Sequence, residues 1–233
     1  TDFIPLFVKT WNKLYPNIDV KIILISNSIP ERFLNYKKNI ILFKPLKGIS
    51  SGFISQYIRL LYPGLLDYKN GVLITDIDML PMNRTYFSKN IENISNNKFI
   101  SMRKAFKGQV PICYCIAIKR TWRKVFKISS IKDVIERLNE VYKDIEYKNN
   151  VYNEAWSKDQ FDLFKHLNEY QKRTNDVVTL SDTNTGFNRL DRTTFELDKN
   201  TVEKIKNGFY TDYHCYRPMY KYWRLNNKIF EIL

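Results

Sequence analysis

The chain has 233 residues, 44% of them hydrophobic and 15% aromatic, and its formal net charge is +14 at pH 7. This composition excludes a disordered chain, and no apolar run reaches the roughly 18 residues of a membrane span. The positive charge favours anionic partners such as nucleic acid, an anionic membrane or phosphorylated small molecules. The lysines are scattered, however, as on an ordinary solvated surface.

The first eighty residues alternate between helical and strand patterns. Apolar spacing predicts helices over residues 3–14 and 51–62. Short β-branched runs, bounded by polar residues or proline, predict strands over 20–25, 39–43 and 71–75. Because alternating strands and helices build a parallel sheet with helices on its faces, we predict an α/β fold with a largely parallel central sheet flanked by helices.

The pattern changes after residue 80. Strands are expected over 98–102, 112–118, 177–180 and 189–194. Helices are expected over 131–147, 156–170, 201–206 and 217–233, with Ser157 as the N-cap of the second. No internal repeat, linker or low-complexity stretch interrupts the chain, which indicates a single domain.

Two carboxylates end the strand predicted at 71–75. Asp76 and Asp78 are spaced i, i+2, which places both side chains on one side of a strand. Like charges this close repel unless a positive group lies between them, and the usual partner of paired carboxylates is a divalent metal ion. A turn cap is one alternative. The nucleophile of a haloacid-dehalogenase-type phosphatase is another, but it fits poorly because Met79 follows and two strands precede.

Other polar residues are expected near this pair. Ser26 and Asn27 follow the first predicted strand, and ligands of α/β sheets bind beyond the carboxyl ends of the strands. These two residues and the aspartate pair are therefore expected to line one crevice. Arg59 lies on the helix just upstream of the pair. It forms either a salt bridge with Asp67 or Asp76, or a contact with a phosphorylated substrate.

Later in the chain, two more features carry candidate chemistry. His214 lies in a polar and aromatic stretch before the last helix; a lone histidine is usually structural, but this one can complete a metal shell. Asp159 and Gln160 stand at the start of the helix predicted over 156–170. There they either cap the helix or hydrogen-bond the hydroxyl groups of a sugar.

The three cysteines, Cys113, Cys115 and Cys215, form no Cys-x-x-Cys pair. The odd count argues against a disulfide framework and for a reducing compartment, and with no signal peptide visible we expect a cytoplasmic protein. A zinc site that combines them with His214 is an alternative, although the spacing is not that of common zinc sites. The sequence opens at Thr1, which is compatible with one part of a larger multidomain protein.

The order of these residues resembles that of glycosyltransferases of the GT-A fold, and in particular the family 8 galactosyltransferases. The matching residues are Ser26 and Asn27 after a strand, Arg59 in a helix, Asp76 and Asp78, Asp159 and Gln160, and the late His214. The segments 74–87 (ITDIDMLPMNRTYF), 156–164 (WSKDQFDLF) and 210–218 (YTDYHCYRP) are similar to the glycosyltransferase domains of large DNA viruses, such as the N-terminal domain of the chlorovirus capsid-glycosylating enzyme. The likeness covers most of the chain.

The resemblance implies one GT-A domain over residues 1–233, with a nucleotide-binding half (1–80) and an acceptor half (81–233) that ends in a metal-binding segment. It implies transfer of a sugar from a nucleoside-diphosphate sugar, expected to be UDP-linked, to a hydroxyl group of a glycan or glycoprotein acceptor. The implied cofactor is Mn²⁺, or Mg²⁺ in its place. If the protein is viral, the expected location is the host cytoplasm.

The resemblance also assigns roles. It gives Asp76, Asp78 and His214 to the metal, Ser26, Asn27, Arg59, Asp76 and Gln160 to the donor, and Arg217 or Lys221 to its diphosphate. Relatives often carry Asn-Ala in the strand that here reads Cys113-Tyr114-Cys115-Ile116-Ala117. If Cys115 replaces that Asn, a hydrogen bond to the donor or acceptor changes, so the sugar specificity does not carry over.

The chemistry of glycosyl transfer agrees with these roles. Charge builds on the leaving diphosphate, and a divalent cation and positive side chains stabilise it. A carboxylate beside the acceptor hydroxyl can take its proton, an effect worth roughly 10²–10⁴-fold in rate. We assign this base role to Asp159 in an inverting displacement; a retaining route, with Gln160 or a nearby group on the other face of the sugar, is the alternative.

Two other classes of function compete with a transferase. One is a basic nucleic-acid-binding module or metal-dependent nuclease that uses Asp76, Asp78 and the lysines. It should show a clustered basic face, which the scattered lysines do not suggest, so no nucleic-acid partner is expected. The other is a sugar-binding domain that has lost catalytic activity, which only an assay distinguishes.

Overall fold

The computed structural model describes residues 2–148 and 155–233. Its α-helices in chain order are α1 (Ile4–Leu14), α2 (Ser51–Leu61), α3 (Tyr86–Lys89), α4 (Lys119–Phe126), α5 (Ile131–Lys143), α6 (Lys158–Thr174), α7 (Asp182–Thr185), α8 (Lys199–Lys206) and α9 (Met219–Ile232). The strands are β1 (Ile22–Ile25), β2 (Ile40–Phe43), β3 (Val72–Ile74), β4 (Met79–Pro81), β5 (Phe99–Ser101), β6 (Cys115–Ala117), β7 (Val177–Thr179), β8 (Arg189–Asp191) and β9 (Asp212–His214). Two 3₁₀ helices, η1 (Glu31–Asn39) and η2 (Tyr62–Gly64), complete the assignment.

Within the described ranges the strands form three sheets, with the orders β1-β2, β3-β6-β5-β7 and β4-β9-β8. The pairs β1–β2, β5–β7 and β8–β9 are parallel, whereas β3–β6, β5–β6 and β4–β9 are antiparallel. The α/β class is therefore confirmed, but the sheets are mixed rather than largely parallel. The physical reason is that β6 returns beside β5 without a crossover helix, and a parallel pair needs such a crossover.

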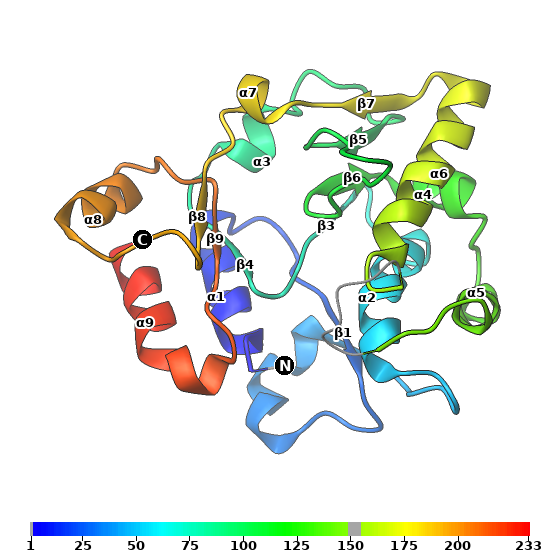
Figure 1. The fold of residues 1–233 in the computed structure, drawn as a ribbon, viewed down its shortest axis with the longest axis horizontal. Coiled ribbons are helices and arrows are strands. Elements are labelled where there is room, and N and C mark those ends of the chain that lie inside the picture. The colour runs from blue at the N-terminus through cyan, green and yellow to red at the C-terminus, as the bar shows by residue number, and fades with distance from the viewer. Residues whose placement is uncertain (1, 149–154) are drawn as a thin grey trace.

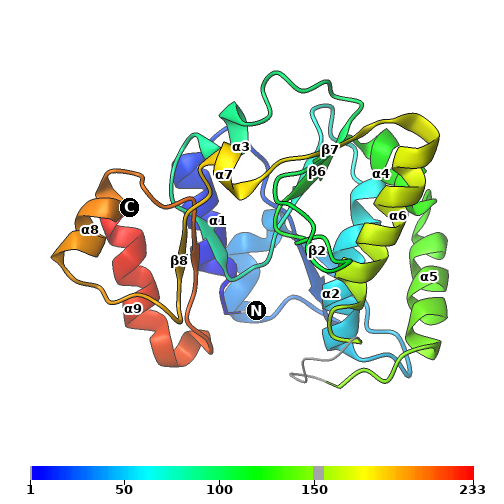
Figure 2. The same cartoon turned by 45° about the horizontal axis from the view of Figure 1, so that its top comes forward.

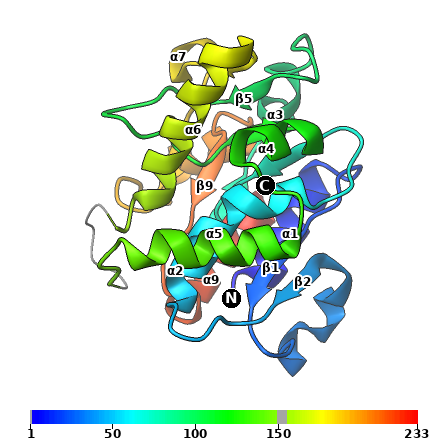
Figure 3. The same ribbon diagram turned by 90° about the vertical axis from the view of Figure 1, so that its right-hand side faces the viewer.

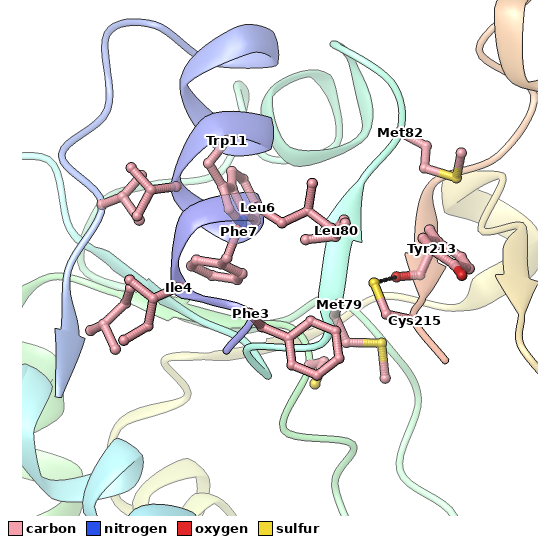
Figure 4. Close-up of a cluster of buried hydrophobic side chains, with 14 of the residues drawn as sticks. Phe3, Ile4, Leu6, Phe7, Trp11, Met79, Leu80, Met82, Tyr213 and Cys215 are labelled. Atoms are coloured by element: carbon pink, nitrogen blue, oxygen red, sulfur yellow. Dashed lines mark hydrogen bonds between the residues drawn. The ribbon is translucent and has the colours of Figure 1, made fainter. Parts of the chain in front are cut away.

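The first hydrophobic core surrounds α1, which forms where the sequence predicts a helix. Ile4, Phe7 and Trp11 recur at helical spacing and are at most 6% exposed. Figure 4 shows Ile4 on the side of α1 toward β1 and Leu6 beside Leu80 of β4, within the same buried cluster. This core fixes the start of β4, directly after the two candidate aspartates.

The second core lies among α2, α4, α5 and α6. Ile54, Ile58 and Leu61 of α2 are at most 1% exposed and pack in one cluster with Trp122 of α4 and Leu163 of α6. Figure 3 shows these four helices covering one side of the molecule. Figures 1 and 2 show them on the side away from α8, α9 and the β4-β9-β8 sheet.

Most of the observed helices and strands lie where the sequence predicts them. Both predicted helices and all three predicted strands of the first eighty residues are present, with ends shifted by one or two residues. The elements that periodicity does not predict are β4, β9, α3, α4, α7 and the two 3₁₀ helices, none longer than the nine residues of η1. Within residues 2–148 and 155–233, no helix is long and apolar enough to cross a membrane.

Candidate active site

A cleft of about 1350 Å³ runs between the two cores. Apolar side chains of β1 and β3 form part of its lining. Charged and polar residues from separate parts of the chain form another part: Arg59, Asp76, Asp78, Asp159, Gln160, Arg192, His214 and Arg217. The structure thus brings most of the sequence-predicted site residues to one cavity.

Strand pairing places Asp78 beside His214. Asp78 directly precedes β4, and the first residue of β4, Met79, lies opposite His214 in β9. The backbone amide of Cys215 donates a hydrogen bond of 2.8 Å to the carbonyl oxygen of Asp78. On the other side of β9, Asp191 at the end of β8 is the register partner of His214.

The carboxylate of Asp78 is nearly buried, with its side chain 10% exposed, and three nitrogen groups surround one of its oxygens. Asp78 Oδ2 lies 3.0 Å from Arg192 Nη1, 3.2 Å from Arg217 Nε and 3.6 Å from His214 Nε2. Burial alone would raise the pKa of Asp78, but these three neighbours outweigh it and lower the pKa to about 2. Asp78 is therefore a carboxylate at neutral pH.

The imidazole of His214 is held from its other side. Nδ1 lies 2.9 Å from Asp191 Oδ2. The other carboxylate oxygen of Asp191 accepts hydrogen bonds from the backbone amide and the hydroxyl of Thr193, at 3.0 and 2.6 Å. Burial raises the pKa of Asp191, but the bonds from Thr193 and His214 reverse this and lower it below its ordinary value.

Asp76 belongs to a second charged group. Arg59 contacts Asp76 through Nη1 and Asp159 through Nη2, the latter at 2.7 Å. The thiol of Cys113 donates to the second oxygen of Asp76 at 2.7 Å. Burial alone would lower the pKa of Arg59, but Asp76 and Asp159 together raise it. Of the partners expected for Arg59, Asp76 is observed, while Asp67 pairs with Lys119.

Asp159 lies in the first turn of α6 and is only 3% exposed. Its Oδ1 accepts a 2.8 Å hydrogen bond from the backbone amide of Gln160. Burial is the largest influence on its pKa and raises it, and the opposing effect of Arg59 does not cancel this. Ser157 is the N-cap residue as predicted, although its side chain makes no capping hydrogen bond.

The other residues predicted to bind the donor are Arg217, Lys221, Ser26 and Asn27, and they differ in their position relative to the cleft. Arg217 lines the cleft and its side chain is 47% exposed, whereas Lys221 is exposed on α9 with its ammonium 5.3 Å from the ring centre of Tyr222. The cleft lining along β1 ends at Ile25, so Ser26 and Asn27, which were expected to line one crevice with Asp76 and Asp78, are not among its lining residues. The donor-binding roles of these residues stay predictions.

The donors expected to hold a metal fit a hard divalent cation in kind, since two are carboxylates and one is an imidazole. Asp78 and His214 are adjacent, but Asp76 faces Arg59 and Cys113. Across the part of the chain that the structure describes, no group of three His, Cys, Asp or Glu side chains is arranged to hold an ion. A site formed by all three residues therefore requires Asp76 to exchange partners.

The sequence did not single out Asp191 or Arg192, and it marked Cys113 only as a ligand of the alternative zinc site. Asp191 ends the observed strand β8 and Arg192 follows it, but both lie inside the strand predicted over 189–194, so neither a strand end nor a motif marked them. Of the two neighbouring cysteines it is Cys113 that contacts a site carboxylate. Cys115 is fully buried, and its thiol faces the carbonyl oxygen of Pro111 at 3.7 Å.

The structure of this chain is similar to solved structures of proteins with which it shares little sequence identity. A crystal structure of an active-site mutant of LgtC matches with a TM-score of 0.50 and 14% identity, covering 99% of this chain and 90% of that chain. The galactosyltransferase LgtC with donor and acceptor sugar analogues matches over the same shares with a TM-score of 0.49 and 14% identity. The apo form of the glycosyltransferase GlyE of Streptococcus pneumoniae TIGR4 matches with a TM-score of 0.45 and 16% identity, covering 99% of this chain and 56% of that chain.

No protein-family model matches the sequence, and a search of curated proteins gives no match. The likeness to LgtC therefore shows the fold alone. The chain has the α/β architecture of that protein, with central sheets flanked by helices.

Proposed function

We propose that this protein is a glycosyltransferase that moves a sugar from a nucleoside-diphosphate sugar, UDP-linked by preference, to a hydroxyl group of a glycan or glycoprotein. The observation that carries the proposal is the bridge from Arg59 to Asp76 and Asp159 in the cleft that also holds Asp78, His214 and Arg217. Fixed cations and a buried carboxylate in one cleft suit the departure of a diphosphate and the removal of a proton. The fold shared with LgtC supports the same class.

In this proposal the guanidinium of Arg217 stabilises the leaving diphosphate. Arg217 touches Asp78 through Nε and is the most exposed of the three arginines in the site. A preorganised positive group in a cleft stabilises developing negative charge without reorganising at the moment of reaction. Arg192 and Arg59 are more buried and hold the carboxylates in place.

Asp159 is the proposed general base of an inverting displacement. Its raised pKa brings the carboxylate closer to the operating pH, which favours proton transfer from a hydroxyl group. Arg59 holds the carboxylate in one orientation from Oδ2. The retaining alternative uses the neighbouring Gln160 on the other face of the sugar, and the anomeric configuration of the product distinguishes the two routes.

Asp76, Asp78 and His214 are the residues that would hold a Mn²⁺ or Mg²⁺ cofactor. When bound, such an ion supplies Lewis-acid stabilisation of the leaving diphosphate. The contacts of Asp78 with two arginines already concentrate positive charge on the same side of the cleft. Cys113, Cys115 and Cys215 are free, buried thiols, which suit the reducing environment of the cytoplasm where we place the reaction.

The test is a thermal-shift screen of nucleoside diphosphates and nucleotide sugars, with and without Mn²⁺, followed by NMR of the product anomer. Ligands that bind the native state raise its apparent stability. We expect stabilisation by a nucleoside diphosphate when Mn²⁺ is present. No response to any nucleotide, together with salt-sensitive DNA binding, would instead establish the nucleic-acid alternative.

A further inference from the structure

Asp191 and His214 are register partners in the β8–β9 pair, and their side chains meet at one edge of the cleft. Asp191 Oδ2 lies 2.9 Å from His214 Nδ1. An ionised carboxylate can only accept a hydrogen bond, so Nδ1 carries the hydrogen. In a neutral imidazole the lone pair then resides on Nε2, which lies 3.6 Å from Asp78 Oδ2.

Asp191 is itself restrained. Thr193 occupies its Oδ1 with two hydrogen bonds, which leaves Oδ2 for the imidazole. The side chains of Asp191 and His214 are 28% and 18% exposed, so the bond between them is partly shielded from water. The ring orientation is therefore determined by β8 rather than by the cleft.

With the hydrogen on Nδ1, Nε2 is the nitrogen that faces Asp78 Oδ2, an oxygen that Arg192 and Arg217 also contact at 3.0 and 3.2 Å. We propose that Asp191 is a positioning residue that fixes His214 as the Nδ1–H tautomer and so presents Nε2, together with Asp78, to a divalent cation. The presence of a cation at this position rests on the proposed function. Carboxylates behind a metal-binding histidine fix the ring in this way, and their loss lowers metal affinity by about 10- to 100-fold.

The first experiment needs no metal. The sequence has two histidines, and His166 lies on α6 with its ring 5.1 Å from that of Phe126, so it serves as an internal control. Long-range ¹H–¹⁵N spectra of the histidine-labelled chain at alkaline pH, in EDTA, report which ring nitrogen is protonated. We expect Nδ1–H for His214 in the unaltered protein and a shift toward Nε2–H in Asp191→Ala, with His166 unchanged.

The second experiment measures Mn²⁺ binding by calorimetry with UDP present. We expect Asp191→Ala to weaken binding 10- to 100-fold. Asp191→Asn should retain most of the affinity, because its amide oxygen still accepts the Nδ1 hydrogen. The matched control is Asp176→Ala: Asp176 is 27% exposed and pairs with Lys98 at 2.9 Å, away from the residues that line the cleft. Thermal melting of each variant verifies that it is folded.

The outcomes separate this inference from the proposed function. An Nε2–H tautomer of His214 in the unaltered protein, or equal Mn²⁺ affinities for Asp191→Ala and Asp176→Ala, overturns the role of Asp191 and leaves the transferase proposal intact. Failure of the unaltered protein to bind Mn²⁺ with any nucleoside diphosphate overturns the metal-dependent function and this inference together. The expected tautomer combined with a selective loss of affinity supports both.

Discussion

Arg59 Nη2 lies 2.7 Å from Asp159 Oδ2, although 100 residues separate the two along the chain. The pair joins α2 to the first turn of α6, and Asp159 is 3% exposed. The same guanidinium also contacts Asp76, so one cation pairs with two carboxylates inside the cleft. Much of the charge balance of the site therefore depends on a single side chain.

Arg59→Met should destabilise the fold by about 3–5 kcal/mol, because it leaves the buried carboxylate of Asp159 without a partner. Urea unfolding followed by circular dichroism measures the change. The double variant Arg59→Met with Asp159→Asn should recover part of the loss, since it removes the uncompensated charge as well. A loss below about 1 kcal/mol for the single variant would show that Asp159 is protonated in the native state rather than paired.

Asp159→Asn should lower the rate of sugar transfer by about 10²- to 10⁴-fold while the donor still binds, because an amide cannot take the acceptor proton. Steady-state kinetics and donor titration measure the two effects separately. Asp162→Asn is the matched control: Asp162 lies on the same helix and is 9% exposed, but its carboxylate bonds Tyr57 and Lys158. Near-normal transfer by a folded Asp159→Asn protein would remove Asp159 as the base.

Local burial explains which elements the sequence predicts. Ile54, Ile58 and Leu61 repeat at helical spacing and all face one core, so the period of α2 is visible without its neighbours. The strands β1 and β2 are predicted for a similar local reason, because each is a short β-branched run with polar residues at its ends. Strand direction is not local, and the antiparallel return of β6 beside β5 therefore differs from the expectation.

Long-range pairing explains what the sequence does not predict. β4 and β9 have three residues each and are strands because Leu80 lies opposite Tyr213, more than a hundred positions away. Arg192 reaches Asp78 only because β8 lies beside β9. Asp76 and Asp78 stood out because both end one strand pattern, whereas the side chains that hold them come from other elements.

Asp78 should make the stability of the protein depend on pH in acid. Its pKa is lowered to about 2 in the folded state, so the stabilisation is fully present above the unfolded value near 4 and is lost as the pH falls toward 2. The shift corresponds to about 2.5 kcal/mol. Urea unfolding in EDTA at several pH values should show a steeper acid loss for the unaltered protein than for Asp78→Asn. Parallel pH profiles for the two proteins would contradict the shift.

Arg217→Ala should weaken binding of a nucleoside diphosphate by about tenfold or more, because one charge-assisted hydrogen bond to a phosphate contributes about 1.5–3 kcal/mol. Arg217 is suited to this role because its side chain is 47% exposed and lines the cleft. Its removal should leave the fold nearly unchanged, since Arg192 still contacts Asp78 at 3.0 Å. Calorimetric titration with UDP measures the loss, and Arg224→Ala, which removes an exposed arginine of the neighbouring helix α9, provides the control. Equal weakening by both variants would mean that the diphosphate responds to the overall charge of this surface, and Arg217 would then have no specific contact with it.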